Sequence, residues 1–331
     1  MNGSAQVIPP PPPPFTACSD WSPGLSEQVA AHREQRADRT LRALEALSGA
    51  PVGRPRPGSV LDYALLHHAL ERCSAAARSG DSAEAHSALA LWAGREDLPR
   101  LPGAGETMAV EATHMVSHHP PGFDDPVYCV TDQAVVGAGR AHQQAFHDIL
   151  ITGRALAVTA GFGPLLTDAC GVVVRTGTQA PGLLPHSYAL SFLPGTVFME
   201  QPEAAETAGE VLVHESSHSW LNECLAAEGA VLPAQPWLHS PWRGEPRPPH
   251  GILHAAFAFS NVVLYLASLQ ERPAGADCPR QKRLTAECRV FTAHRRDIDR
   301  VLALVPSPAV RELVGERLSL VDALGPDARP R

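Results

Sequence analysis

The chain has 331 residues, of which 44% are hydrophobic and 19% are charged. This composition excludes a disordered protein and allows a sizeable core, in one large domain or two. The formal net charge of −8 gives no electrostatic reason to expect nucleic acid or an anionic membrane as a partner. No apolar run approaches the roughly 20 residues that a membrane span needs, so no transmembrane segment is expected.

The first 22 residues are predicted to form a disordered tail, because they contain the proline run from Pro9 to Pro14. They carry no basic stretch followed by an apolar core, so a secretory signal is not expected. The seven cysteines are scattered and form no Cys-x-x-Cys pair. This pattern predicts reduced thiols and a cytoplasmic location.

A helical region is predicted for residues 23–130. Its apolar spacing indicates helices over 26–48, 60–78 and 83–93. His67 and His68 fall within the second helix and have no partner at ligand spacing, so we interpret them as surface or packing residues.

A histidine cluster near the end of this region is a weak second candidate for a metal site. His114 and His118 have the i, i+4 spacing, and His119 follows directly. The pair lacks a flanking glutamate, and Pro120 and Pro121 come next, so a solvated loop end is the favoured interpretation.

Residues 131–331 are predicted to form a second, metal-binding region. Short β-branched or alternating runs indicate strands over 171–176, 188–192 and 196–199, which would make a small sheet. Around it we expect helices over 132–158, 203–227, 250–269, 279–305 and 307–324. The predicted fold class is therefore α+β and mostly helical, with a zincin-like metal-binding helix beside a small sheet. In such layouts an edge strand can hold an extended peptide by strand addition.

The helix over 203–227 carries the motif His214-Glu215-x-x-His218. Positions i and i+4 lie on one face of a helix, so His214 and His218 can hold one metal ion. Glu215 projects about 100° away, close enough to reach a metal-bound water or a partner of a ligand. Cys224 lies on the same helix but points elsewhere, and we interpret it as a small core residue.

The third ligand that a catalytic metal needs is not part of this helix. The metzincin continuation is excluded, because Leu221 and Cys224 stand where that pattern has glycine and histidine, and no methionine follows. The helix over 250–269 has no acidic residue, and its metal-competent side chains near the start are His250 and His254. The third ligand is therefore most simply one of these two histidines.

A three-histidine site can hold zinc in a hydrolase or Fe(II) in an oxygenase. Arg243 and Arg247 precede His254 in a loop over 229–249 that also holds two tryptophans. A bidentate arginine is the group that best binds the distal carboxylate of 2-oxoglutarate. The two arginines therefore favour an oxygenase that uses this co-substrate.

At this point the sequence resembles a known family. The motif His214-Glu215-x-x-His218, then Ser240-Pro241-Trp242-Arg243 and Arg247-Pro248, then Gly251-x-Leu253-His254, is similar to bacterial His-Glu-x-x-His proteins that modify peptide natural products. Some members are regarded as Fe(II)/2-oxoglutarate-dependent peptide β-hydroxylases. The resemblance covers roughly residues 150–270 and leaves the N-terminal third unmatched.

The resemblance implies His214, His218 and His254 as iron ligands and Arg243 or Arg247 as the 2-oxoglutarate contact. It further implies O2 as co-substrate and a ribosomally made precursor peptide as partner. Glu215 would then be an additional ligand of the metal, or a partner of one of its ligands, rather than a hydrolytic base.

Two alternatives stay open. One is a zinc metallopeptidase with Glu215 as base, because an isolated His-Glu-x-x-His most often has that meaning. The other is a non-catalytic peptide-binding protein with a structural metal, which a four-ligand site including His250 would favour.

Overall fold

The computed structural model describes residues 23–98, 100–101, 107–111, 140–178, 182–269 and 279–325. The predicted proline-rich tail and the cluster of His114, His118 and His119 lie outside these ranges. Within them the protein is mostly helical with a small sheet, which confirms the predicted α+β, mostly helical class, whereas metal binding by the helix over 203–227 stays a prediction.

Three helices open the described chain: α1 (Pro23–Ser48), α2 (Val60–Ser79) and α3 (Ser82–Ala93). Their bounds match the predicted helices to within a few residues. The Ser59 hydroxyl accepts a hydrogen bond from the Asp62 backbone N–H at the start of α2, and Asp81 caps α3 in the same way. Side-chain caps of this kind satisfy backbone donors that have no partner within the helix. A short 3-10 turn, Arg95–Asp97, follows α3.

The sheet has the order β1-β2-β4-β3, formed by Met108–Glu111, Val172–Thr178, Thr196–Gln201 and Ser187–Tyr188. β1, β2 and β4 are parallel, whereas β3 is a short antiparallel strand at the edge. Parallel strands are covered on both faces, which is why β2 begins with the continuous run Val172-Val173-Val174.

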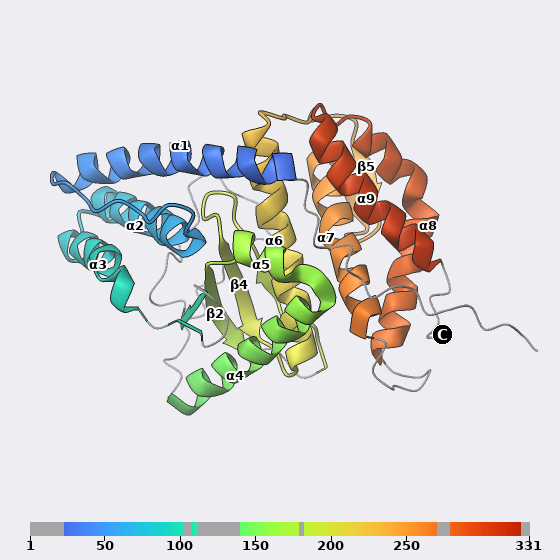
Figure 1. Ribbon diagram of the computed structural model, residues 1–331, viewed down its shortest axis with the longest axis horizontal. Coiled ribbons are helices and arrows are strands. Elements are labelled where there is room, and N and C mark those ends of the chain that lie inside the picture. Colours follow the sequence, from blue (N-terminus) through green and yellow to red (C-terminus); the bar gives the residue numbers. More distant parts are fainter. Residues whose placement is uncertain are drawn as a thin grey trace, which may run out of the picture.

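The two faces of the sheet belong to two hydrophobic cores. Val172, Val174 and Phe198 pack with α1, α2 and α3, whereas Val173 and Val197 pack with the later helices. Figure 1 shows α1–α3 and α7–α9 on opposite sides, with the sheet, α4, α5 and α6 between them.

The segment before β2 contains α4 (Arg140–Ala157), a π-helical turn (Val158–Phe162) and α5 (Gly163–Ala169). The first part of the helix predicted over 132–158 lies outside the described residues. The π turn contains Gly161 with φ of 91°, a conformation that glycine adopts at little cost. The break separates α4 from α5 and redirects the chain toward β2.

The remaining helices are α6 (Ala205–Ala227), α7 (Pro249–Ser268), α8 (Pro279–Leu302) and α9 (Pro308–Leu324). As predicted, Ser307 caps α9, accepting from the Val310 N–H at 3.2 Å, with proline in the first turn. By length and composition, Gln144–Ala169 and Pro249–Ser268 could each cross a membrane. In the second, 78% of the most apolar window is buried within the protein, as in the core helix of a globular protein.

Two sequence predictions are wrong in detail. The strand predicted over 188–192 is limited to Ser187–Tyr188, because a turn follows in which the Leu193 N–H donates to the Leu190 carbonyl. The loop predicted over 229–249 contains a hairpin of β5 (Leu238–Ser240) and β6 (Glu245–Arg247). Gly244, with φ of +67°, lies in its tight turn.

The N-terminal helices contact the motif helix directly. Glu223 of α6 is 1% exposed and accepts hydrogen bonds from Arg33 Nε at 3.1 Å and Arg36 Nη1 at 3.0 Å. The Tyr63 hydroxyl of α2 is 3.4 Å from the same carboxylate. A buried carboxylate therefore links α1 and α2 to the helix that carries His214 and His218.

Candidate metal centre

The motif helix α6 is buried on nearly all sides rather than on one amphipathic face. It crosses α4 so closely that a Cβ on Gly153 would lie 2.7 Å from the Ala208 Cβ. A Cβ on Gly209 would collide with the Tyr265 hydroxyl and would lie 2.7 Å from the Gly153 carbonyl oxygen. Glycine is required at both positions because no side chain fits there. This close packing between α4, α6 and α7 fixes the position of the motif.

The structure brings the four candidate histidines together. His214 Nε2 and His218 Nε2 are 3.2 Å apart on α6. His218 Nδ1 lies 3.2 Å from His254 Nδ1 on α7. The ring of His250 follows, with its centroid 4.3 Å from that of His254. Residues predicted from two separate helices thus form one continuous row.

His214 Nε2 and His218 Nε2 lie at the distance expected for two ligands of one metal ion. A separation of 3.2 Å is what two nitrogens bound at about 2.0–2.1 Å to one ion would have at an angle of roughly 100°. His218 presents its other nitrogen to His254, however. Accordingly, among the described residues no group of three or more His, Cys, Asp or Glu is arranged to hold a metal as it stands. A change of side-chain torsion at His218 or His254 is needed before three rings can bind one ion.

Burial keeps these imidazoles neutral. It lowers the pKa of His218 to about 4, with help from the charges of His250 and Arg243. Burial also holds the pKa values of His214 and His254 well below the usual range. Neutral imidazole is the form that binds metal ions. His254 Nε2 is buried and has no hydrogen-bond partner among the described residues, so it retains a free site for a donor or a cation.

Glu215 points toward the edge strand of the sheet. Its Oε1 accepts a 2.8 Å hydrogen bond from the Ser187 hydroxyl of β3. Burial raises the pKa of Glu215 to about 7, against the opposing effects of that hydrogen bond and of the Arg243 charge. Such a carboxyl can hold or release a proton near neutral pH.

The structure separates the two candidate arginines. Arg243 lies near the histidines, since its charge lowers the pKa values of His214, His218 and Glu215. Arg247 instead donates two hydrogen bonds, of 2.9 and 2.6 Å, to Glu245 on its own strand. In the described part of the chain Arg243 has no carboxylate partner, so its guanidinium is the better placed of the two to receive a ligand anion.

An aromatic stack supports the hairpin that carries Arg243. The Trp242 ring lies parallel to Phe259 of α7, with centroids 5.2 Å apart and planes inclined by 3°. Phe259 in turn meets the His214 ring edge-on at 4.8 Å. Trp242 Nε1 also donates to Glu287 of α8 at 3.3 Å. The stack therefore connects α8, the hairpin and the first motif histidine.

Sequence reasoning missed several residues around the site. Glu210 of α6, which was not singled out, is buried and pairs with Arg283 of α8 at 2.6 Å. Ser187 of β3, which hydrogen-bonds Glu215, lies just before the strand predicted over 188–192 and was not singled out. No local pattern identifies such partners, because each contact joins segments that are distant in sequence.

Other predictions about candidate residues are confirmed or corrected by burial. Cys224 is a fully buried core residue, as predicted. His67 and His68 are packing residues and not surface residues, being 4% and 0% exposed. Their rings hydrogen-bond the Tyr63 carbonyl at 2.8 Å and the Thr196 hydroxyl at 2.9 Å.

Comparison with known proteins adds no assignment. Neither a protein-family model nor a curated protein sequence matches the chain.

Proposed function

We propose that this protein is an Fe(II)/2-oxoglutarate-dependent enzyme that hydroxylates a side-chain β-carbon of a ribosomally made precursor peptide. The observation that carries the proposal is the row of half-buried His214 and His218 and buried His254, all neutral, beside an arginine that forms no ion pair with a carboxylate among the described residues. A hydrolase would use such an arginine only to stabilise an oxyanion, whereas the distal carboxylate of a dicarboxylate co-substrate requires a cationic partner. The proposal includes a cytoplasmic location, with which the buried, unpaired thiols of the four cysteines that the structure describes are compatible.

The metal would be held by His214, His218 and His254. When bound, iron with 2-oxoglutarate and O2 supplies the oxidising chemistry that converts a C–H bond to C–OH, with release of succinate and CO2. Arg243 would bind the distal carboxylate of the co-substrate. Trp242 and Phe259 would hold the hairpin and the His214 ring in place, and their apolar surfaces would help to exclude water.

Glu215 would act through the edge strand. Its hydrogen bond to Ser187 ties α6 to β3, the strand beside which an extended peptide could lie. The carboxyl would thus orient the substrate-binding edge relative to the metal ligands rather than take a proton from water.

A zinc metallopeptidase is the second candidate, and one observation favours it. Burial raises the pKa of Glu215 to about 7, which suits a general base at neutral pH. In that case Glu215 would activate a metal-bound water, and Arg243 would stabilise the developing oxyanion.

Mass spectrometry of a precursor peptide separates the two candidates. The peptide is incubated with the protein, Fe(II), 2-oxoglutarate and O2, or with the protein and Zn(II) alone. Hydroxylation adds the mass of one oxygen atom and forms one succinate per turnover. Cleavage into two fragments that depends on zinc and not on 2-oxoglutarate would overturn the proposal in favour of the peptidase.

A matched pair of variants tests the assigned role of Arg243. Arg243→Ala is expected to raise the KM for 2-oxoglutarate by roughly tenfold or more, whereas Arg247→Ala is expected to change it little. The reverse order would show that the co-substrate contact is Arg247.

A further inference from the structure

A cavity lies on the side of α6 that faces away from the histidines. Trp220, which lines it, follows His218 by two residues and so projects about 200° around the helix from it. The cavity is a cleft of about 480 Å³. This volume is within the range of roughly 300–1,000 Å³ that is typical of ligand pockets.

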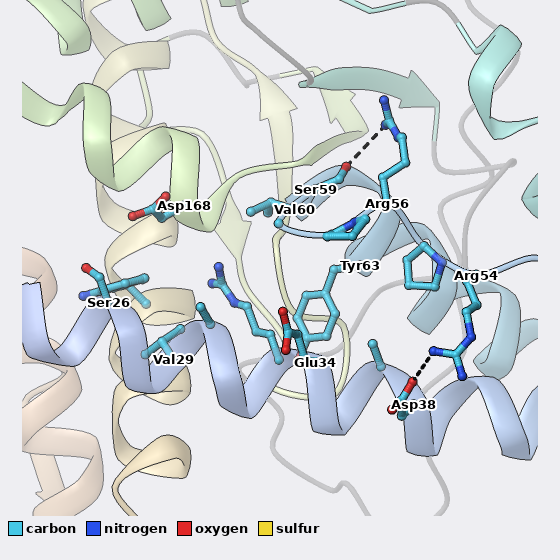
Figure 2. A pocket seen from close by; sticks show the side chains of 17 residues that line it. Ser26, Val29, Glu34, Asp38, Arg54, Arg56, Ser59, Val60, Tyr63 and Asp168 are labelled. Atoms are coloured by element: carbon cyan, nitrogen blue, oxygen red, sulfur yellow. Dashed lines mark hydrogen bonds and ion pairs between the residues drawn. The ribbon is translucent and has the colours of Figure 1, made fainter.

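Three parts of the chain form the cleft. One wall is α1, the other is the segment 54–60 with the start of α2, and Asp168 of α5 and Trp220 of α6 complete the lining. Figure 2 shows α1 along one side, with Asp168 and the Asp38–Arg54 pair toward opposite ends of the view. Apolar surface on both walls comes from side chains that include Val29, Pro57 and Val60.

The cationic side chains of the lining are all engaged with carboxylates. Arg33 pairs with Glu223 at 3.1 Å. Arg54 pairs with Asp38 at 3.0 Å, and Arg56 pairs with the fully buried Asp62 at 2.7 Å. These arginines are held in structural pairs, so the cleft does not present an unpaired positive charge to a ligand.

Two lining carboxylates have no such partner. Neither Glu34 of α1 nor Asp168 of α5 forms a hydrogen bond or ion pair with the described part of the protein, and Asp168 is half-buried. Burial raises the pKa of Asp168, and the charge of Arg33, which is itself paired with Glu223, offsets this effect only in part. The 22 residues that precede α1 contain no lysine or arginine that could pair with Asp168.

We propose that this cleft binds an organic cation on an apolar stem, an ammonium or guanidinium group, with Asp168 as its counter-ion. The apolar walls receive the stem, Asp168 receives the charge, and Glu34 at the exposed wall favours the approach of a cation. A basic side chain of a peptide and a free alkylamine share this chemistry. The inference does not depend on the proposed oxygenase activity, because the cleft and the histidines lie on different faces of α6.

Calorimetric titration of the full chain tests this site with three probes: the peptide acetyl-Ala-Lys-Ala-amide, the same peptide with norleucine in place of lysine, and n-butylammonium. The lysine peptide or the alkylamine is expected to bind, and the norleucine peptide to bind roughly tenfold more weakly or not at all. Binding of both cations would show that the site accepts a basic side chain of a peptide as well as a free alkylamine. Binding of the alkylamine alone would assign it to a small molecule.

Variants identify the counter-ion. Asp168→Asn is expected to weaken cation binding by roughly tenfold or more. Glu27→Gln, which removes an exposed carboxylate of α1 outside the cleft, is expected to leave binding unchanged. Ala30→Phe adds bulk at an exposed lining position and provides a second test that leaves Asp168 in place.

Three results would overturn the proposal: no binding of either cation, equal binding of the norleucine peptide, or full binding by folded Asp168→Asn protein. Loss of iron binding in histidine variants would bear on the proposed function and would leave these titrations unaffected.

Discussion

Arg33 of α1 donates a 3.1 Å hydrogen bond to Glu223 of α6, although 190 residues separate the two in sequence. The carboxylate is almost fully buried and also accepts from Arg36. The N-terminal helices and the motif helix therefore share a buried ionic contact five residues after His218. This contact makes the first helix part of the framework of the candidate site.

Replacement of Glu223 is predicted to destabilise the whole fold. Glu223→Gln leaves Arg33 and Arg36 without their carboxylate, and breaking a buried pair in this way typically costs about 3–5 kcal/mol. Asp38→Asn is the matched control, because it removes a carboxylate from the exposed pair with Arg54, which is worth at most about 1 kcal/mol. Urea unfolding at pH 7 measures both. Equal free energies of unfolding for the two variants would contradict the role assigned to Glu223.

Acid is predicted to destabilise the protein through His67 and His68. Burial lowers the pKa of each from 6.5 to about 3. Below pH 6.5 the unfolded chain therefore binds protons that the folded state does not bind. The contribution of the two neutral histidines to the free energy of unfolding is fully present above pH 6.5, and it is lost as the pH decreases from 6.5 toward 3. At pH 5 the loss is about 2 kcal/mol per histidine.

A variant of one histidine tests this linkage. His68→Gln is expected to reduce the difference in unfolding free energy between pH 7 and pH 5 by about 2 kcal/mol. His86→Gln, which changes an exposed histidine of α3, is expected to leave the difference as it is. A pH dependence that is the same in both variants would contradict burial of a neutral His68.

Loss of the Ser187 hydroxyl is predicted to raise the pKa of Glu215 above its value of about 7. The reason is that the 2.8 Å hydrogen bond favours the charged carboxylate, so its removal favours the protonated form. The carboxyl carbon signal of glutamate-labelled protein, followed by NMR against pH, gives the pKa, and Glu215→Gln identifies the signal. Ser191→Ala is a control on the turn after β3. A lowered pKa in Ser187→Ala would mean that the hydroxyl does not donate to Glu215.

The stack between Trp242 and Phe259 is predicted to set the affinity for 2-oxoglutarate. Trp242→Ala removes a contact of the kind worth about 0.5–1.5 kcal/mol and frees the hairpin that carries Arg243, so binding is expected to weaken by up to roughly tenfold. Trp242→Phe keeps the stacking and is expected to bind nearly as the parent protein. Trp237→Ala, at an exposed position before the same hairpin, serves as control. Anaerobic titration measures all three, and an unchanged affinity in Trp242→Ala would exclude this role.

Much of the fold could be predicted from the sequence because its helices have regular apolar spacing and clear caps. The helix of Val60–Ser79 and the cap at Ser307 are examples. The strand predicted over 188–192 was too long, because alternation of side chains does not reveal where a turn interrupts pairing. The hairpin within 229–249 was missed because its strands have three residues each, and one of them includes a proline.

For the candidate site too, some residues could be predicted from the sequence and some contacts could not. His214 and His218 could be proposed as ligands because one helix fixes their spacing. The lack of acidic residues on the helix over 250–269 left His250 and His254 as candidates for the third ligand, and only the family resemblance selected His254. The separation of Arg243 from Arg247 could not be found, since it depends on the local pairing of Arg247 with Glu245. Likewise, the 3.2 Å contact between His218 Nδ1 and His254 Nδ1 depends on ring torsions that no sequence pattern specifies.

The most direct test of the central claim is the visible spectrum of the protein after anaerobic addition of Fe(II) and 2-oxoglutarate. A three-histidine iron site with bound co-substrate predicts a weak charge-transfer band. The band is expected to be lost in His214→Ala, His218→Ala and His254→Ala. It is expected to be retained in His239→Ala, which changes an exposed histidine. Absence of the band from the parent protein, together with zinc-restored cleavage of a peptide, would contradict the claim.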